Sequence, residues 1–481
     1  MPTQPRVMPV PELDERARAC ASRLLDSDRV LLASHIDADG LTSAAIASRA
    51  LERAGLDHEV VFKKQLDETE IASIAAREFE TVLFTDFGSG QLDDIAKHER
   101  AGDFEAVIAD HHQPADAETE YHLNPLLEGI DGASELSGAG ASYLLARAMA
   151  ERSGQREDNR DLAALAVVGA VGDMQAVDGE LVGANRALVE EGSEAGVLEE
   201  GQDIAIYGKQ TRPLPKLLEY ATDVRIPGIT NNEQGAVGFL EELPVDLKTP
   251  DGDGEWRRWV DLTDDEKQTV VSALLQRALE RGVPPNKAER LVGTTYTLTD
   301  ERPGTSLRDA SEFSTLLNAT ARYERADVGL AVCLGERGEP FEQARRLLET
   351  HRRNLSEGLE QVKRQGVETA EHLQYFDAGE EIRETIVGIV AGMALGVDGV
   401  DSDRPIVAFA RKNEEELKVS ARGTGPLVGR GLDLSVVMSE ASRAVGGDGG
   451  GHDIAAGATI PDDRREAFVE RADELVASQI G

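Results

Sequence analysis

The chain has 481 residues, and its 90 acidic and 51 basic side chains give a formal net charge of −39 at pH 7. Hydrophobic residues make up 40% of the chain, which is enough for packed cores, but no apolar run approaches the ~20 residues that span a bilayer. Composition therefore excludes a generally disordered chain and a membrane-spanning protein.

The N-terminal segment and the cysteines bear on the cellular compartment. Residues 1–27 lack the apolar stretch of a signal peptide, and we expect them to form a helical extension. Cys20 and Cys333 are too few for a disulfide framework or a thiolate zinc site. We therefore expect an intracellular, cytoplasmic protein with no membrane partner.

The next part of the chain alternates short apolar runs with helical patterns. The apolar runs predict strands at 30–33, 60–62, 82–85 and 106–109, and the helical patterns between them lie at 41–54, 70–78 and 91–99. Strands that alternate with helices predict an α/β fold with a parallel sheet covered by helices. In such sheets ligands bind beyond the carboxyl ends of the strands.

Polar side chains that can bind metal follow these strands. His35, Asp37 and Asp39 alternate along the chain, so on extended backbone their side chains project to the same side. Further candidates follow two later strands and the apolar helical segment 162–171, namely Asp86, Asp110, His111, His112 and Asp173. The sequence thus gathers acids and imidazoles at one edge of the predicted sheet.

Each of these residues also has an ordinary explanation. An aspartate after a strand is commonly a helix N-cap, an Asp-His-His run can lie on the surface, and Asp173 can be solvated. Together, however, several aspartates in one crevice cannot all ionise without cations. Two divalent ions would compensate them. Mixed carboxylate and imidazole ligands favour manganese over magnesium, and a site with two ions suits displacement at phosphorus.

The order and spacing of these motifs resemble the DHH phosphoesterase superfamily, which includes RecJ-type exonucleases. The resemblance implies one ion held by His35, Asp37 and Asp86. It implies a second ion held by four residues, with Asp86 bridging: Asp39, Asp86, His111 and Asp173. It also implies that His112 faces the substrate phosphate and that Asp110 orients His111.

The C-terminal third predicts a second binding element. Segments 406–410 and 417–421 predict a hairpin, and the glycine-rich run 446–451 offers backbone N–H groups to an anion. A flexible linker is the alternative. The run resembles the DHH-associated C-terminal domain, which implies that substrate phosphate is bound by catalytic Arg422 and by Gly449, Gly450, Gly451 and His452.

The middle of the chain resembles the archaeal RecJ-like, helicase-associated nucleases, above all at residues 311–322. Within it Asn318 and Arg322 are expected to contact substrate, although helix packing and solvation explain them equally well. Residues near 245–295 resemble these proteins least, and we expect an acidic insert there.

The expected domains are a 28–200 DHH catalytic domain, a 201–305 connecting region and a smaller 306–481 α/β DHH-associated domain. A substrate cleft is expected between the first and the last. The resemblance implies a metal-dependent exonuclease that degrades single-stranded DNA, rather than RNA, from 5′ to 3′. The alternatives are an oligonucleotide or cyclic-dinucleotide phosphodiesterase and a replisome scaffold bound to the replicative helicase.

The acidic surplus needs its own explanation. Dispersed like charges repel one another in dilute buffer, but at molar salt the screening length falls to about 3 Å. We interpret the charge as adaptation to a salt-rich cytoplasm, with an ordinary acidic protein as the alternative. Affinity for a nucleic acid would then depend on metal ions rather than on a basic surface.

Overall fold

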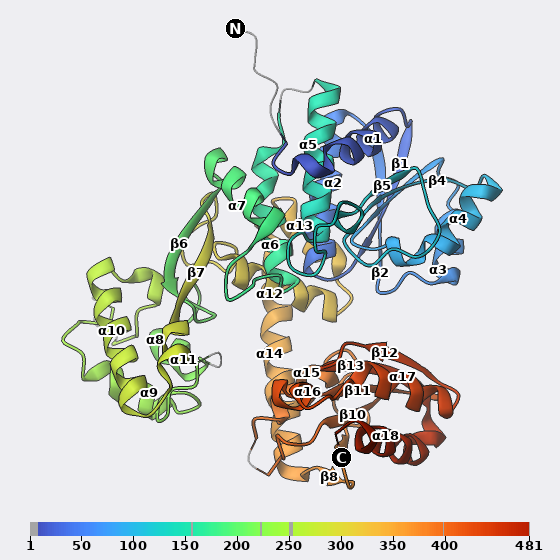
Figure 1. Ribbon diagram of the computed structural model, residues 1–481. Helices are drawn as coiled ribbons and strands as arrows, with labels where there is room; N and C mark the ends of the chain where they lie inside the picture. Colours follow the sequence, from blue (N-terminus) through green and yellow to red (C-terminus); the bar gives the residue numbers. More distant parts are fainter. Residues whose placement is uncertain (1–7, 155–156, 222–223, 250–253, 398, 481) are drawn as a thin grey trace. The chain divides into compact units, whose positions relative to one another are not determined.

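The structure is a computed structural model that describes residues 8–154, 157–221, 224–249, 254–397 and 399–480 (Figure 1). The chain divides into two compact units, Met1–Arg345 (unit 1) and Arg346–Gly481 (unit 2). The start of the expected N-terminal extension (1–7) and part of the expected acidic insert (250–253) lie outside the described residues.

Unit 1 contains the parallel α/β sheet that the sequence predicts. Its strands are β1 (Arg29–His35), β2 (Asp57–Lys63), β3 (Thr81–Thr85), β4 (Glu105–Ala109) and β5 (Tyr121–Leu123). They pair in the order β2-β1-β3-β4-β5, and every pairing is parallel. The central strand β3 is buried at each position, as expected for a parallel strand covered on both faces. The predicted fold class is therefore confirmed.

The two faces of this sheet are covered by different helices. Val30 and Leu32 of β1 enter one core and Leu31 and Ala33 enter the other, because successive side chains of a strand point to opposite faces. The first core is closed by α1 (Asp14–Leu25), α2 (Ala38–Ala54), α5 (Gly138–Ser153), α6 (Ala163–Gly172) and α7 (Gly183–Ala195). The second is closed by α3 (Glu68–Ala75) and α4 (Leu92–Ala101).

The connecting region forms a small body with its own core. The antiparallel strands β6 (Leu198–Ile204) and β7 (Val292–Leu298) frame four helices, α8 (Leu214–Glu219), α9 (Glu233–Glu241), α10 (Asp264–Glu280) and α11 (Pro285–Ala288). Trp259 is 1% exposed and packs in one core with Leu217, Phe239 and Leu274. Since the residues expected to form an insert share this core with α8 and α9, they are an integral part of the body.

Two further helices of unit 1, α12 (Ala310–Arg322) and α13 (Ala326–Cys333), pack against α2, and α12 also packs against α6. Asp309 caps α12 by accepting hydrogen bonds from Ser311 N and Glu312 N, and its Oδ2 lies 2.7 Å from Lys209 Nζ. These helices belong to unit 1, so the expected boundary at residue 306 falls before the observed division. The helix α14 (Glu339–Gln365) crosses that division.

Unit 2 is a second, smaller α/β body. Its strands are β8 (Glu368–Thr369), β9 (Gln374–Asp377), β10 (Ile406–Arg411), β11 (Glu416–Arg422), β12 (Asp448–Gly451) and β13 (Ala455–Pro461), in the order β12-β13-β11-β10-β9-β8. The antiparallel pair β10 and β11 is the predicted hairpin. The helices are α15 (Val387–Ala394), α16 (Gly425–Gly429), α17 (Leu434–Ala444) and α18 (Arg465–Ile480).

The glycine-rich run does not form a loop along its whole length. Gly449–Gly451 lie in β12, the edge strand of the unit 2 sheet, and pair with β13. A Cβ at position 449 would lie 2.8 Å from the Met438 carbonyl oxygen, and Gly451 has φ +143°, so both positions require glycine. Because β12 is an edge strand, one side of its backbone has no strand partner. Among the described residues, none of the helices is both long and apolar enough to cross a bilayer.

We predict that Asp309→Ala lowers the free energy of unfolding by about 3–5 kcal/mol, because Lys209 would keep a buried charge without its partner. Urea unfolding followed by circular dichroism measures this change. Asp67→Ala is the matched control, since Asp67 caps α3 on the surface and its loss costs about 1 kcal/mol. Equal losses in the two variants would contradict the role of the buried pair.

Candidate metal centre

The candidate ligands come together at the carboxyl edge of the unit 1 sheet. Three elements end there: β1 with His35, β3 just before Asp86, and β4 just before Asp110. Asp37 is the N-cap of α2, Asp39 lies in its first turn, and Asp173 is the C-cap of α6. The fold thus brings residues that are far apart in sequence to the edge where ligands of such sheets bind.

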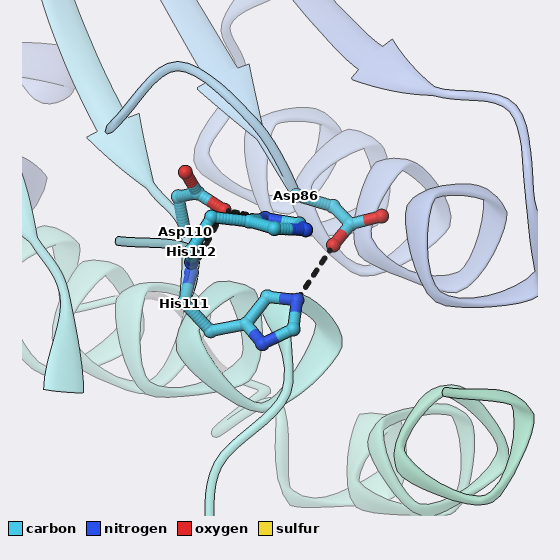
Figure 2. Close-up of side chains that lie close together, drawn as sticks. All are labelled: Asp86, Asp110, His111 and His112. Carbon is cyan, nitrogen blue, oxygen red and sulfur yellow. Dashed lines mark hydrogen bonds and ion pairs between the residues drawn. The ribbon is translucent and has the colours of Figure 1, made fainter. Parts of the chain in front are cut away.

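Asp86 lies between two imidazoles. Its Oδ2 is 3.5 Å from His35 Nδ1. Its Oδ1 is 3.2 Å from His111 Nε2, a contact drawn as a dashed line in Figure 2. On one side His35 Nδ1 also lies 3.1 Å from Asp37 Oδ2. On the other side His111 Nε2 lies 3.7 Å from Asp39 Oδ2 and 3.8 Å from Asp173 Oδ2. The six residues therefore form two adjoining groups that meet at Asp86.

The backbone at Asp86 is strained. Asp86 is 2% exposed and has φ +58°, a conformation that costs a residue with a side chain about 1–2 kcal/mol. Gly138 makes room for it, since a Cβ at that position would lie 2.5 Å from Asp86 Oδ1. Such strain in a buried, charged position is typical of functional sites.

Asp39 is held by the N-terminus of α5. Its two carboxylate oxygens accept hydrogen bonds from Gly138 N at 2.7 Å and Ala139 N at 2.9 Å, and the residue is 1% exposed. The positive end of the helix dipole favours an anion there. This contact was not predicted from the sequence, although the N-cap residue Ser137 followed by small residues marks the start of a helix.

Asp110 orients His112 rather than the ring of His111. Its Oδ1 accepts from His112 Nδ1 at 2.8 Å and from the backbone N of His111 at 2.8 Å, as Figure 2 shows for the ring of His112. The ring of His111 is instead held by the carbonyl oxygen of Gly132, 2.7 Å from Nδ1. Asp110 was expected to orient His111, and it contacts the backbone N of His111, while the Gly132 carbonyl oxygen holds the ring.

Burial and crowding shift the pKa values of the acids in opposite directions. Burial, followed by the charges of Asp86 and Asp173, raises the pKa of Asp39 well above its usual value. Burial also raises the pKa of Asp173, to about 6. At Asp86 burial is outweighed by His111 and His35, which hold its pKa well below the usual range. Without added cations, the acids thus cannot all ionise in the ordinary pH range.

The imidazoles carry part of the compensating charge. Burial lowers the pKa of His35, but its interactions with Asp37 and Asp86 outweigh burial and raise the pKa to about 11. Burial of His111 is likewise outweighed, mainly by Asp86, so its pKa rises well above the ordinary value. In the absence of a metal ion, these two rings therefore hold protons at neutral pH.

The donors fit divalent cations. His111 Nε2 is buried and has no hydrogen-bond partner of good geometry among the described residues, so it is placed to act as a ligand. Atoms of His35, Asp37 and Asp86 lie close enough to hold one ion, and those of Asp39, His111 and Asp173 close enough to hold another. A third such group consists of Asp86, Asp110, His111 and His112. Mixed oxygen and nitrogen donors suit manganese and related metals.

The remaining candidates fall into two sets. In unit 1, Asn318 Oδ1 accepts a hydrogen bond from Ala38 N at 3.0 Å, so it touches the first residue of α2, between Asp37 and Asp39. Arg322 lies exposed at the end of α12. In unit 2, Arg422 Nη1 donates to the Ala421 carbonyl oxygen at 2.8 Å, and Gly449–Gly451 and the exposed His452 follow one another along the chain. The substrate-binding roles of these residues stay predictions.

Family models match three segments of the chain. They are described as the DHH family, N-terminal domain (29–170), the DHH-CID domain (206–292) and the DHHA1 domain (371–478). The DHH-CID match includes most of the residues near 245–295. The expectation that this segment is the part with the least resemblance is therefore corrected.

Whole proteins also match. An uncharacterized protein of Methanocaldococcus jannaschii is 30% identical over 479 residues, which cover 98% of each chain.

Solved structures match the fold as well. RecJ of Thermus thermophilus with Mn²⁺ is 19% identical with a TM-score of 0.60, covering 98% of this chain but only 56% of RecJ. An exonuclease RecJ bound to manganese is 19% identical with a TM-score of 0.59, and the match covers 98% of this chain and 96% of that chain. CDC45 from Entamoeba histolytica is 11% identical with a TM-score of 0.62, and the match covers 97% of this chain and 99% of that chain. At sequence identities this low, the similarity to these structures shows a shared fold.

We predict that Mn²⁺ binding at pH 7.5 releases protons, because His35, with a pKa of about 11, must lose its proton to become a ligand. Affinity should therefore rise with pH, and it should fall further below about pH 6, where Asp173 takes up a proton. Calorimetric titrations in two buffers of different ionisation enthalpy measure the released protons. Equal apparent enthalpies in both buffers would contradict the prediction.

Proposed function

The chain belongs to the DHH family of phosphoesterases, and on this premise we propose that it is a RecJ-like exonuclease. Its substrate in this proposal is single-stranded DNA, degraded from 5′ to 3′ with two divalent ions, manganese in preference to magnesium. The observation that carries the proposal is the position of Asp86 between His35 and His111, with Asp37, Asp39 and Asp173 around them. This arrangement offers ligands for two neighbouring cations.

The residues around the centre have separate roles in the proposed reaction. Two divalent ions would supply Lewis acidity and lower the pKa of the water that attacks phosphorus. His35, Asp37 and Asp86 would hold one ion, and Asp39, His111 and Asp173, together with Asp86, the other. Both buried aspartates are preorganised, Asp39 by the α5 N-terminus and Asp86 by the two rings.

His112 is suited to contact the substrate phosphate. Its side chain is 55% exposed, while Asp110, which is fully buried, fixes the ring through Nδ1. The hydrogen bond to Asp110 also raises the pKa of His112, so the ring carries positive charge more readily. A charged imidazole donates strong hydrogen bonds to phosphate oxygens. His112 would thus stabilise negative charge that builds up during the reaction.

Residues outside the centre would position the strand. Asn318 Oδ1 accepts a hydrogen bond from Ala38 N, and the Nδ2 of the same amide would donate to substrate. Arg322, Arg422 and His452 would donate to phosphates, and the open edge of β12 at Gly449–Gly451 would offer backbone N–H groups. These contacts are what would hold a strand end and make the enzyme an exonuclease.

Two other functions remain alternatives. The same centre would also cleave short oligonucleotides or cyclic dinucleotides, since the chemistry at phosphorus is shared. A scaffold role on a replicative helicase is the second alternative, and the observation in its favour is the CDC45 fold, matched over nearly the whole of both chains. The full set of metal-capable side chains favours catalysis, with or without such docking.

We predict Mn²⁺-dependent degradation of an end-labelled 30-nucleotide DNA strand in molar potassium chloride. Asp39→Ala and His111→Ala should each lower the rate about a thousandfold or more, because each removes several kcal/mol of transition-state stabilisation. Asp67→Ala and His98→Ala are matched controls on the surface and should keep the wild-type rate. Activity that survives both changes in the centre would contradict the proposal.

The substrate length and the partner separate the alternatives. A dinucleotide cleaved much faster than the 30-nucleotide strand would identify an oligonucleotidase. Copurification with helicase components that is equal for wild type and Asp86→Ala, together with no nuclease activity in either, would identify a scaffold. End-labelling at either terminus, with DNA and RNA strands in parallel, tests the direction and the sugar preference.

A further inference from the structure

Gln175 lies directly behind the metal-capable side chains. It is 1% exposed, and its amide Nε2 lies 2.9 Å from Asp173 Oδ2 and 2.8 Å from the carbonyl oxygen of Gly132. The same carbonyl accepts the hydrogen bond from His111 Nδ1. The amide of Gln175 thus contacts the carboxylate of Asp173 directly. It is linked to the ring of His111 through the Gly132 carbonyl oxygen, which accepts from both.

The backbone after α6 directs Gln175 inward. Met174 N donates to the Val171 carbonyl and Gln175 N donates to the Ala170 carbonyl, the pair of bonds that reverses a chain at a helix end. Met174 has φ +59°, which is unusual for a residue with a side chain, and is 87% exposed. The turn therefore leaves Met174 in solvent and returns Gln175 beneath Asp173.

The orientation of the Gln175 amide is fixed by Asn185. Asn185 lies on α7, is 1% exposed, and its Nδ2 donates to Gln175 Oε1 at 2.7 Å. The backbone N of Asn185 donates in turn to the Glu135 carbonyl oxygen. Since Oε1 accepts from Asn185, both protons of Gln175 Nε2 face acceptors, namely Asp173 Oδ2 and the Gly132 carbonyl. The Gly132 carbonyl oxygen accepts two hydrogen bonds, from Gln175 Nε2 and from His111 Nδ1, and so joins the two side chains.

The network has a consequence for the ring of His111. With Nδ1 donating to the Gly132 carbonyl, the other nitrogen, Nε2, is left to face Asp86, Asp39 and Asp173. Groups that hold a ligand ring or carboxylate in this way tune metal affinity without touching the ion.

We propose that Gln175 is a positioning residue of the metal centre and that Asn185 acts through it. Gln175 holds Asp173 and, through the Gly132 carbonyl, His111 in the orientation that a divalent ion requires. The inference rests on the proposed function in one respect, that the centre binds divalent ions. A purely structural glutamine would instead contribute to folding and leave metal affinity unchanged.

The test is calorimetric titration of the metal-free full chain with Mn²⁺, for wild type and for Gln175→Met. Methionine keeps the approximate volume but removes both the donors and the acceptor. We expect Mn²⁺ to bind 10- to 100-fold more weakly at one site, the range found when such outer contacts are lost. Circular dichroism of the metal-free proteins shows whether each variant is folded.

Gln374→Met is the matched control. Gln374 is also 1% exposed, and its Nε2 donates to two carbonyl oxygens, those of Asp401 and Arg404, while its Oε1 accepts from Asp401 N. The control therefore loses the same number of amide hydrogen bonds from a buried site in unit 2, where all three partners are backbone atoms. We expect it to lower thermal stability and to leave Mn²⁺ affinity within twofold of wild type.

Asn185→Ala gives a second, independent comparison. It should weaken Mn²⁺ binding less than Gln175→Met and in the same direction, and it should add no further loss in the Gln175→Met background. If Gln175→Met does not fold, the Mn²⁺ affinity of Asn185→Ala, measured by the same calorimetric titration, tests the inference alone.

Two outcomes would overturn the inference. One is wild-type Mn²⁺ affinity in a folded Gln175→Met or, where that variant does not fold, in Asn185→Ala. The other is an equal loss of affinity in Gln374→Met. Both leave the proposed function intact if the wild type binds Mn²⁺ and cleaves DNA, whereas a wild type that binds no Mn²⁺ refutes the proposed function itself.

Discussion

Repulsion between carboxylates that share a space with little water is the constraint on which this site depends. Asp39 and Asp86 are almost wholly buried, and both face the same imidazole nitrogen of His111. Such a group is stable only if positive charge or aligned N–H groups lie close by. The fold provides the start of α5 at Asp39 and the rings of His35 and His111 at Asp86. The arrangement of helices at this edge of the sheet serves that need.

Much of the fold and the identity of the metal-capable residues could be predicted because both rest on local patterns. Apolar runs gave the strands, and a polar residue after a parallel strand must lie at the sheet's carboxyl edge. The supporting contacts could not be predicted, because they use backbone groups that every residue has, such as the N–H of Gly138 and the carbonyl of Gly132. The inward direction of Gln175 depends on a positive φ at Met174, which methionine rarely adopts.

The glycine-rich run and the connecting region show the limit of composition as a guide. Glycine is unfavourable in strands, yet β12 pairs with β13 at every position from Asp448 to Gly451. Acidic side chains near residues 245–295 suggest a solvated insert. Trp259 and Leu274 nevertheless join a core with helices that precede them in sequence. In both segments pairing and packing with other elements decide the structure, and composition does not display these contacts.

The lack of a side chain at Gly138 has an evolutionary consequence. A single added methyl group there would lie 2.5 Å from Asp86 Oδ1 and 2.9 Å from Asp86 Cα, so the residue that links the two halves of the cluster would have to move. The geometry of the cluster can therefore be lost through a very small genetic step.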